Sequence, residues 1–279
     1  MLGKLLKYEF KSTSRVLWFL YAGLIVVALL FGLVLRVELN VGDIFLTGSS
    51  VQSGSGSSLI MTILMTALGL IYMLMIYAIF ITTVVVIVMR FYKNMLGGEG
   101  YLMHTLPVKT SNLIFSKLIT ACCWMLIATA VVVVSTLVLG LSSGIITEIF
   151  KHVEFKEVMQ TIRYVFKEIG ISGWSFGIMM IVSTISTILL YYMSMAIGNL
   201  ANNHKFLFSV LAYVGVQIAL SIIITITSVV SGRTMMMMDE YNSVWLSNYM
   251  WTLTLTQALL GVVGFFVTNY LLSKKLNLA

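Results

Sequence analysis

Six long stretches of this sequence contain no charged residue, and this absence constrains the fold more than any other feature. The hydrocarbon core of a bilayer is about 30 Å thick and takes about 20 apolar residues of helix to cross. A Lys, Arg or Asp at the centre of such a helix costs roughly 2.5–3.5 kcal/mol. Charge-free stretches therefore mark candidate spans. They predict transmembrane helices at about 16–35, 59–89, 118–142, 173–197, 206–230 and 248–272.

The composition agrees with a membrane protein. Hydrophobic residues make up 59% of the 279 residues and charged residues 10%, whereas soluble domains carry about 25% charged residues. We expect one all-α transmembrane domain over residues 1–279. Its second span is longer than a membrane requires, because a helix over Leu59–Met89 would measure about 46 Å. Such a helix must tilt, protrude or break, and Gly69 is the expected weak point.

The distribution of Lys and Arg predicts the topology. With six spans, both termini lie on one side, together with the Arg90–Lys117 and Gly198–Lys205 loops. That side carries eleven Lys/Arg and two acidic residues, and the other side carries six Lys/Arg and eight acidic residues. Positive residues concentrate on the cytoplasmic side, so both termini are expected to be cytoplasmic. The net charge of +7 is thus mainly explained by topology, and membrane lipid rather than nucleic acid is the expected partner.

Two amphipathic segments lie outside the expected spans. Near the N-terminus, apolar residues at helical spacing beside three lysines predict an interfacial helix that turns into the first span. The alternative is a basic flank that only sets topology. The second segment, Lys151–Ile169, has an apolar stripe at helical spacing. It predicts an external amphipathic helix between the third and fourth spans, or else a connector with no role beyond packing.

No motif in the sequence predicts catalysis, and we expect no enzyme activity, metal site or bound cofactor in this chain. Neither G-x-x-x-x-G-K-[ST] nor H-E-x-x-H occurs. The three histidines fall in separate segments on both sides of the membrane: His104, His152 and His204. Cys122 and Cys123 are adjacent in an apolar run, which is neither disulfide nor zinc spacing. Thioethers can bind Cu(I), but the spacing of Met235–Met238 around a helix favours apolar contact.

Neutral polar residues recur within the spans. Six of them are candidates for a substrate path: Thr62, Thr66, Tyr72, Tyr213, Gln217 and Ser221. In lipid, such side chains most often bond their own backbone or a neighbouring helix. The alternative is a weakly polar pathway between helices.

The loop between the second and third spans, Arg90–Lys117, is larger than the topology requires. Glycines at positions 97, 98 and 100 allow sharp turns around Glu99. Tyr101–Leu106 is short and rather apolar, and Pro107 ends it. A small apolar helix held at the cytoplasmic surface is a docking feature. The alternative is a loop that packs on its own bundle.

At these residues the sequence resembles the permease subunits of ABC-2 type ABC transporters. The family pattern is a glutamate, a glycine-led hydrophobic turn, Leu-Pro-Val, and a lysine that opens the third span. The matching residues here are Glu99, Gly100, Tyr101, Leu102, Leu106, Pro107, Val108 and Lys117. Gly100 stands where many members have arginine, and Lys109-Thr110 stands where many have Ser-Arg. The family's external hairpin between spans five and six would have to fit within Ser231–Ser247.

The resemblance implies an N-terminal elbow helix, six spans, and a cytoplasmic coupling helix between the second and third spans. It assigns ATPase coupling to Glu99, Gly100, Tyr101, Leu102, Met103, His104, Thr105, Leu106 and Pro107. ATP and Mg would bind a separate ABC ATPase subunit. A second permease copy, as a homodimer, or a paralogue would complete the transporter in the cytoplasmic membrane of a bacterium.

Within that family, the layout is most similar to Firmicute exporters of phenol-soluble-modulin-type peptide toxins. The resemblance implies export of hydrophobic or amphipathic cargo, such as toxin or antimicrobial peptides. One alternative is a peptide-sensing or immunity subunit that performs no transport. A purely structural membrane subunit is another.

Overall fold

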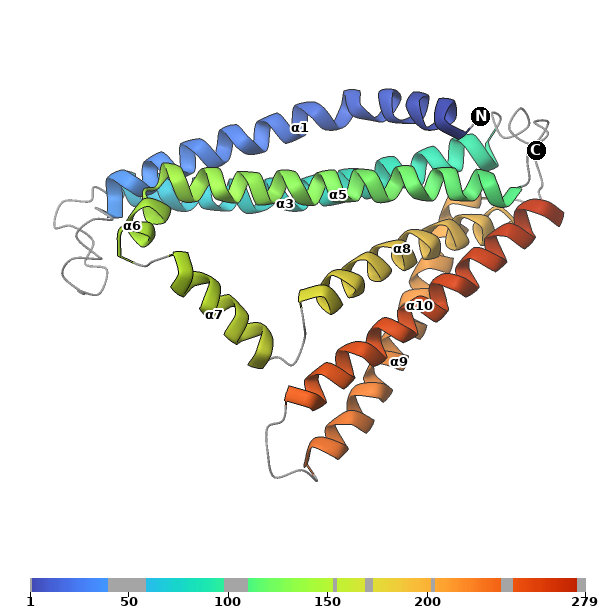
Figure 1. Ribbon diagram of the computed structural model, residues 1–279. Helices are drawn as coiled ribbons and strands as arrows, with labels where there is room; N and C mark the ends of the chain where they lie inside the picture. The colour runs from blue at the N-terminus through green and yellow to red at the C-terminus, as the bar shows by residue number, and fades with distance from the viewer. Residues whose placement is uncertain are drawn as a thin grey trace. The chain divides into compact units, whose positions relative to one another are not determined.

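The computed structural model describes residues 2–39, 59–97, 110–152, 155–168, 173–201, 204–236 and 243–274. Throughout these residues the chain is almost entirely helical (Figure 1). Six helical segments are long and apolar enough to cross a membrane: Leu17–Val37, Met61–Leu96, Thr110–Ser142, Ser175–Gly198, Lys205–Thr227 and Tyr249–Lys274. The described residues therefore confirm a helical protein with six candidate membrane spans.

Several helices extend beyond these apolar windows. In chain order they are α1 (Leu2–Leu39), α3 (Leu59–Phe91), the π-helix η1 (Tyr92–Leu96), α5 (Thr110–Ser142), α6 (Ile145–His152), α7 (Phe155–Glu168), α8 (Gly173–Gly198), α9 (Lys205–Met236) and α10 (Ser243–Lys274). Long helices suit this sequence because a helix satisfies its backbone hydrogen bonds internally, which hydrocarbon cannot do. The single proline of the chain, Pro107, lies outside the described helices.

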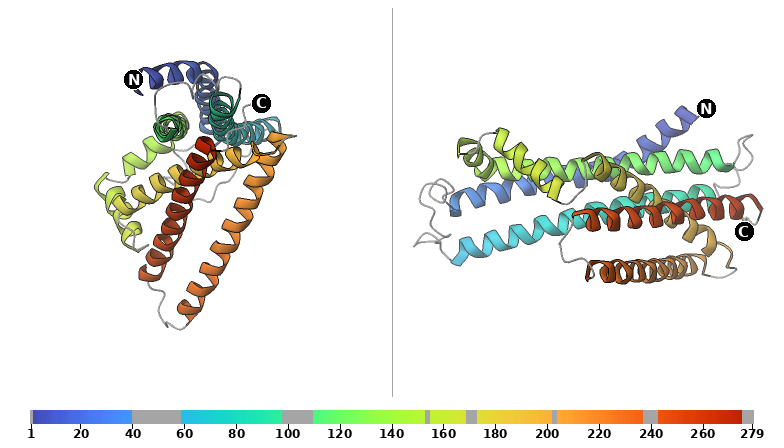
Figure 2. Two further views of the ribbon diagram at one scale, coloured as in Figure 1. Left: turned by 90° about the vertical axis from the view of Figure 1, so that its right-hand side faces the viewer. Right: turned by 60° about the horizontal axis from the view of Figure 1, so that its bottom comes forward.

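Helix α1 joins two elements that the sequence predicts separately. It runs from Leu2 to Leu39 without interruption, so the amphipathic N-terminus and the first span form one helix, which bends along its length (Figure 2). Helix α3 also continues through Gly69, the predicted weak point. A Cβ atom at Gly69 would lie 3.3 Å from the Phe31 ring. This glycine therefore lies at a helix contact and does not break the helix.

Helix α5 starts at Thr110, eight residues before the charge-free stretch that marks the third span. Lys117 therefore lies inside the helix, where its side chain is only 5% exposed.

The amphipathic helix predicted over Lys151–Ile169 corresponds to α7, which runs from Phe155 to Glu168 inside the predicted bounds. A separate short helix, α6, covers Ile145–His152, so Lys151 and His152 belong to α6 rather than to α7.

The described chain divides into two compact units. The N-terminal unit comprises Lys7–Val85 and Cys123–Gln160. The C-terminal unit comprises Met1–Leu6, Val86–Cys122 and Thr161–Ala279. The long helices α3 and α5 contribute residues to both units.

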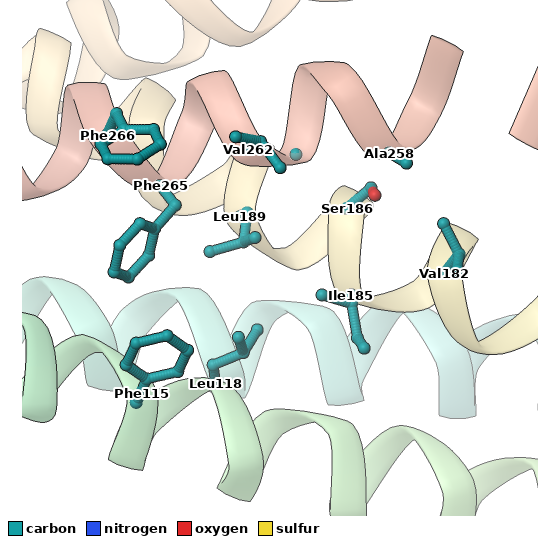
Figure 3. A pocket seen from close by; sticks show the side chains of 11 residues that line it. Phe115, Leu118, Val182, Ile185, Ser186, Leu189, Ala258, Val262, Phe265 and Phe266 are labelled. Atoms are coloured by element: carbon teal, nitrogen blue, oxygen red, sulfur yellow. The ribbon is translucent and has the colours of Figure 1, made fainter. Parts of the chain in front are cut away.

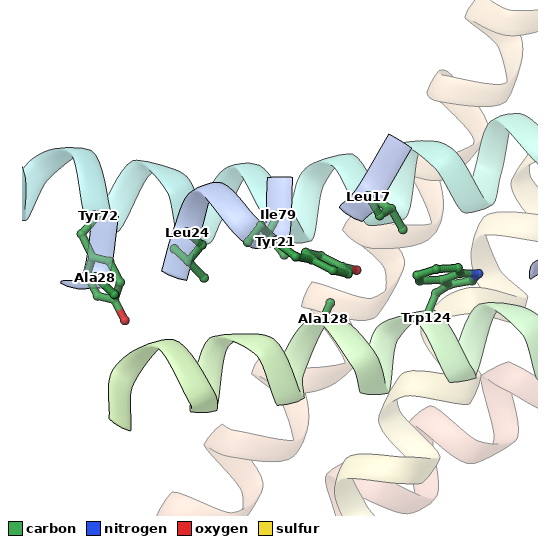
Figure 4. Close-up of a cluster of buried hydrophobic side chains, with 8 residues drawn as sticks. All are labelled: Leu17, Tyr21, Leu24, Ala28, Tyr72, Ile79, Trp124 and Ala128. Carbon is green, nitrogen blue, oxygen red and sulfur yellow. The ribbon is translucent and has the colours of Figure 1, made fainter. Parts of the chain in front are cut away.

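The core of the N-terminal unit lies among α1, α3 and α5, which run side by side (Figure 1). Its buried residues are Leu17, Tyr21, Leu24, Ala28, Tyr72, Ile79, Trp124 and Ala128 (Figure 4). The Phe10 and Trp124 rings stack at 4.5 Å between centroids. Close approach depends on small residues, because a Cβ atom at Gly32 would collide with Ser142 of α5. Such small-residue contacts are typical of membrane helix packing.

In the C-terminal unit, α8 packs against both α9 and α10 (Figure 1). The contact with α10 is close at Gly261, where a Cβ atom would lie 2.7 Å from the Ser186 hydroxyl oxygen. Helix α8 also lies close to α9 at Gly198, where a Cβ atom would collide with Ser209. Glycine at both positions thus allows α8 to lie against its two neighbours.

Helix α5 ends in a glycine turn. Gly144 has φ of 82°, a left-handed conformation that glycine adopts without steric cost. The preceding Ser143 N–H donates to the Leu139 carbonyl oxygen at 2.9 Å. This αL-type C-terminal turn satisfies carbonyl groups that the helix end would otherwise leave unpaired, and it leads directly into α6.

Candidate functional site

The predicted ATPase-coupling segment, Glu99–Pro107, lies outside the described residues. The structure does describe both of its flanks. Helix α3, η1 and Gly97 come before the segment, and α5 begins at Thr110 after it. The candidate site is therefore built from these two flanks and from the polar residues within the spans.

Buried side chains anchor the flank before the segment. Phe91 and Met95 are 0% exposed and Leu96 is 5% exposed. The Phe91 ring stacks on Tyr192 of α8, with centroids 4.0 Å apart and planes inclined by 9°. An aromatic pair of this kind contributes about 0.5–1.5 kcal/mol beyond its area burial. The end of α3 is thus held against α8.

The last turn before the segment is the π-helix η1. Such wide turns are rare, and they frequently occur at functional sites. The Gly97 N–H closes the turn by donating to the Tyr92 carbonyl oxygen at 2.9 Å. A Cβ atom at Gly97 would lie 2.9 Å from the backbone oxygen of Lys93. A larger residue at this exit would force the backbone to shift.

The flank after the segment is anchored as well. In the first turns of α5, Leu113 and Ile114 are buried. The centroids of the Phe115 ring and the Phe265 ring of α10 are 4.9 Å apart, and the ring planes are inclined by 41°. The charged Lys117 is also buried in this part of the helix. The two flanks therefore contact α8 and α10, and all these residues belong to the C-terminal unit.

In the N-terminal unit, two of the three candidate path residues of α3, Thr66 and Tyr72, have side-chain hydrogen bonds, and Thr62 is exposed. The Thr66 hydroxyl donates to the Thr62 carbonyl oxygen at 2.6 Å. The Tyr72 hydroxyl lies 3.1 Å from the Ser135 hydroxyl and 3.2 Å from the Thr136 hydroxyl, and Tyr72 is buried. Tyr72 therefore links α3 to α5, as polar residues in membrane helices commonly do.

In the C-terminal unit, two candidate path residues form a polar cluster with a third residue. The Gln217 side-chain amide donates to the Tyr213 hydroxyl at 2.8 Å. The Tyr213 hydroxyl donates to the Tyr191 hydroxyl of α8 at 3.4 Å, and the two rings stack at 4.9 Å. All three residues are partly exposed. Ser221, one turn further along α9, is exposed and donates to the Gln217 carbonyl oxygen at 2.9 Å.

The structure brings Tyr213, Gln217 and Ser221 together on α9. Thr62, Thr66 and Tyr72 lie in the other unit. Helix α9 is also the least buried of the six candidate spans: 6% of its window is buried, against 33% for α8. Its polar cluster is half-buried against α8.

The sequence analysis missed two features of this region. The first is the burial of Lys117, which we interpreted as a charge at the membrane boundary. The second is the adjacent pair Tyr191 and Tyr192, which serves two contacts: Tyr191 meets Tyr213, and Tyr192 meets Phe91. Two consecutive tyrosines within an apolar span were the available signal, since a tyrosine buried in apolar surroundings usually needs a hydrogen-bond partner.

Two other predicted features are described in part. Met235 and Met236 end α9, and the remaining methionines of that run lie outside the described residues. In α7, the stripe residues Met159, Ile162 and Val165 are 43–47% exposed. The apolar face of α7 is thus partly accessible, as expected for a helix that meets a membrane surface or another protein.

Comparisons of the chain with protein-family models, with curated proteins and with solved structures find no match. The class of the protein therefore comes from its own helices. Six apolar helices of spanning length support a multi-pass membrane protein.

Proposed function

We propose that the chain is the permease subunit of an ATP-driven ABC exporter that moves hydrophobic or amphipathic cargo, such as toxin or antimicrobial peptides, across the bacterial cytoplasmic membrane. The ATPase is a separate subunit that binds ATP and Mg. In this proposal both termini and the Glu99–Pro107 segment are cytoplasmic, as the distribution of Lys and Arg favours.

One observation carries the proposal: both ends of the coupling segment are anchored to the same set of helices. Phe91, before the segment, stacks on Tyr192 of α8. Phe115, after it, contacts Phe265 of α10. A force that an ATPase applies to the segment would thus reach α8 and α10 through close aromatic contacts. Packed interfaces switch between discrete arrangements, so such a force would shift the helices rather than merely bend a loop.

The chemistry of the spans supports an apolar or amphipathic cargo. Intramembrane charges usually mark ion and proton pathways, and the charged residues of the six candidate spans lie toward the ends of the spans, at Arg36, Arg90, Lys93, Lys117, Lys205 and Lys274. The cluster of Tyr191, Tyr213 and Gln217 offers neutral hydrogen-bonding groups on the weakly buried helix α9. In this proposal it forms part of the cargo path, and a second copy of the chain or a paralogue covers α9.

The experiment combines capture of the ATPase with transport. A photo-cross-linking amino acid at Thr105 should capture an ABC ATPase in intact cells. Inside-out vesicles that contain both subunits should then accumulate a labelled amphipathic peptide only when ATP is present. Leu102→Glu and Leu106→Glu should abolish both the capture and the accumulation, because a carboxylate is costly to bury in an apolar groove.

Asn112→Glu is the matched control, since Asn112 is exposed in the first turn of α5, where a negative charge is tolerated. Wild-type levels of ATPase association in the Leu102→Glu variant would count against the proposal. Peptide binding without ATP-dependent accumulation would instead indicate a sensing or immunity subunit. Absence of both peptide binding and ATP-dependent accumulation would indicate a purely structural subunit.

A further inference from the structure

The C-terminal unit contains an apolar cavity beside the contact of Phe115 with Phe265. It has a volume of about 380 Å³ and lies among α5, α8 and α10 (Figure 3). Phe115 and Leu118 form one wall, Val182 and Leu189 of α8 form another, and residues of α10 from Ala258 onward form the third. Every lining residue belongs to one compact unit.

The chemistry of the wall restricts the ligand. Ser186 is the one polar side chain among the eleven lining residues, and none of them is charged. An unpaired polar group costs roughly 2–7 kcal/mol when it moves from water into apolar surroundings. Ions and strongly polar molecules are therefore excluded. The cavity fits a ligand that is hydrocarbon over most of its length.

The size of the cavity restricts the ligand further. A helix with its side chains is about 10–12 Å across and rises about 5.4 Å per turn. The 380 Å³ of the cavity would therefore hold only about one turn of a helical peptide. A single flexible hydrocarbon chain is much narrower and can fill the same volume along its length.

The rim of the cavity is exposed within helices of spanning length. Phe115 is 47% exposed, Val262 53% and Phe266 65%, and all three lie inside candidate membrane windows. At that depth the surrounding medium is lipid hydrocarbon. An empty cavity would cost its wall the dispersion contacts that a filled one makes, so an entering chain would stabilise the unit.

We propose that this cavity is a binding site for one acyl chain of a membrane lipid. The lipid chain seats between α8 and α10 with the Phe115 and Phe265 rings beside it. Phe115 and Phe265 also form the contact proposed to anchor the coupling segment, but lipid binding at this site does not require that the chain moves cargo.

The test uses the full chain in vesicles of palmitoyl-oleoyl phosphatidylcholine that contain a small fraction of phosphatidylcholine with a photoactivatable diazirine on one acyl chain. Cross-links should concentrate on the cavity-lining stretches of α8 and α10. Ala258→Phe, which fills the cavity from α10, should reduce that yield several-fold. Val182→Phe fills it from α8 and provides a second variant should the first fail to fold. Wild-type protein should also retain one phospholipid per chain in native mass spectrometry after extensive detergent washing.

Leu259→Phe is the matched control, because Leu259 is next to Ala258 in sequence but is 67% exposed and does not line the cavity. It should keep the wild-type cross-linking yield. Equal labelling of the cavity stretches and of the exposed face of α9, unchanged by the filling variants, would overturn the proposal. Loss of lipid cross-linking when an amphipathic peptide is added before photolysis would overturn the assignment to lipid and indicate a cargo site.

Discussion

Replacing the stacked pair Phe91 and Tyr192 by leucine tests whether the end of α3 is energetically coupled to α8. The two side chains are 0% and 1% exposed, and their rings stack at 4.0 Å. Leucine keeps an apolar side chain in place while removing the ring. The comparison of Phe91→Leu, Tyr192→Leu and the double variant isolates the pairwise interaction from the cost of each single change.

The magnitude follows from the geometry. A stacked pair contributes about 0.5–1.5 kcal/mol beyond its area burial. The double variant should therefore be less destabilised than the sum of the single variants by about that amount, up to roughly tenfold in the equilibrium constant. Truncation to alanine at Phe91 should cost more, about 3–5 kcal/mol, because it also leaves a cavity.

The assay is equilibrium unfolding in bicelles, for example by steric trapping, which gives a free energy of unfolding for each variant. Phe115 and Phe265 provide a control cycle. Their ring centroids are 4.9 Å apart, the rings are tilted, and Phe115 is 47% exposed. Their coupling free energy should therefore be at most about 0.5 kcal/mol. Strictly additive effects at Phe91 and Tyr192 would refute the anchoring argument. If the proposed coupling holds, Phe91→Leu should also lower ATP-driven accumulation without releasing the ATPase.

Three further predictions concern single side chains. Tyr72→Phe removes the hydroxyl that bridges α3 and α5 and should cost about 0.6 kcal/mol, the average for hydrogen bonds between membrane helices; unfolding measurements that show a stability gain would contradict this. Gly261→Ala places a Cβ atom 2.7 Å from the Ser186 hydroxyl oxygen and should cost about 1–3 kcal/mol, whereas Gly215→Ala meets open space and should be neutral or stabilising by up to about 1 kcal/mol. Gly97→Ala crowds the exit of the π-helix and should reduce ATP-driven accumulation more than thermal stability; equal loss of both would assign Gly97 a structural role alone.

The positions of the long apolar helices could be predicted from the sequence because a charge-free run of sufficient length is a local property of one helix. The fourth span, predicted at residues 173–197, corresponds to α8 at Gly173–Gly198. The fifth, predicted at 206–230, lies within α9. Each prediction needed only the absence of charge over about 20 residues, which any single helix displays without reference to its neighbours.

Contacts between helices could not be predicted in this way. Lys117 has the same charge whether it faces water or is buried, so the sequence placed it at a boundary while the fold places it inside α5. Gly69 could equally have broken its helix or received the Phe31 ring. Among the candidate path residues, the role of each side chain depends on the residue that it contacts. Tyr72 bridges two helices, and Tyr213 joins a cluster on α9.

The sequence by itself thus determined that this chain forms six apolar helices of spanning length, because a charge-free run carries that information along one helix. Only the tertiary structure decided that Phe91 meets Tyr192, that Gly261 lies against Ser186, and that a cavity opens beside Phe265. The physical reason is that lipid tails are as apolar as leucine. Hydropathy therefore does not distinguish a side chain that faces lipid from one that faces another helix, and shape and close contact select the pairs.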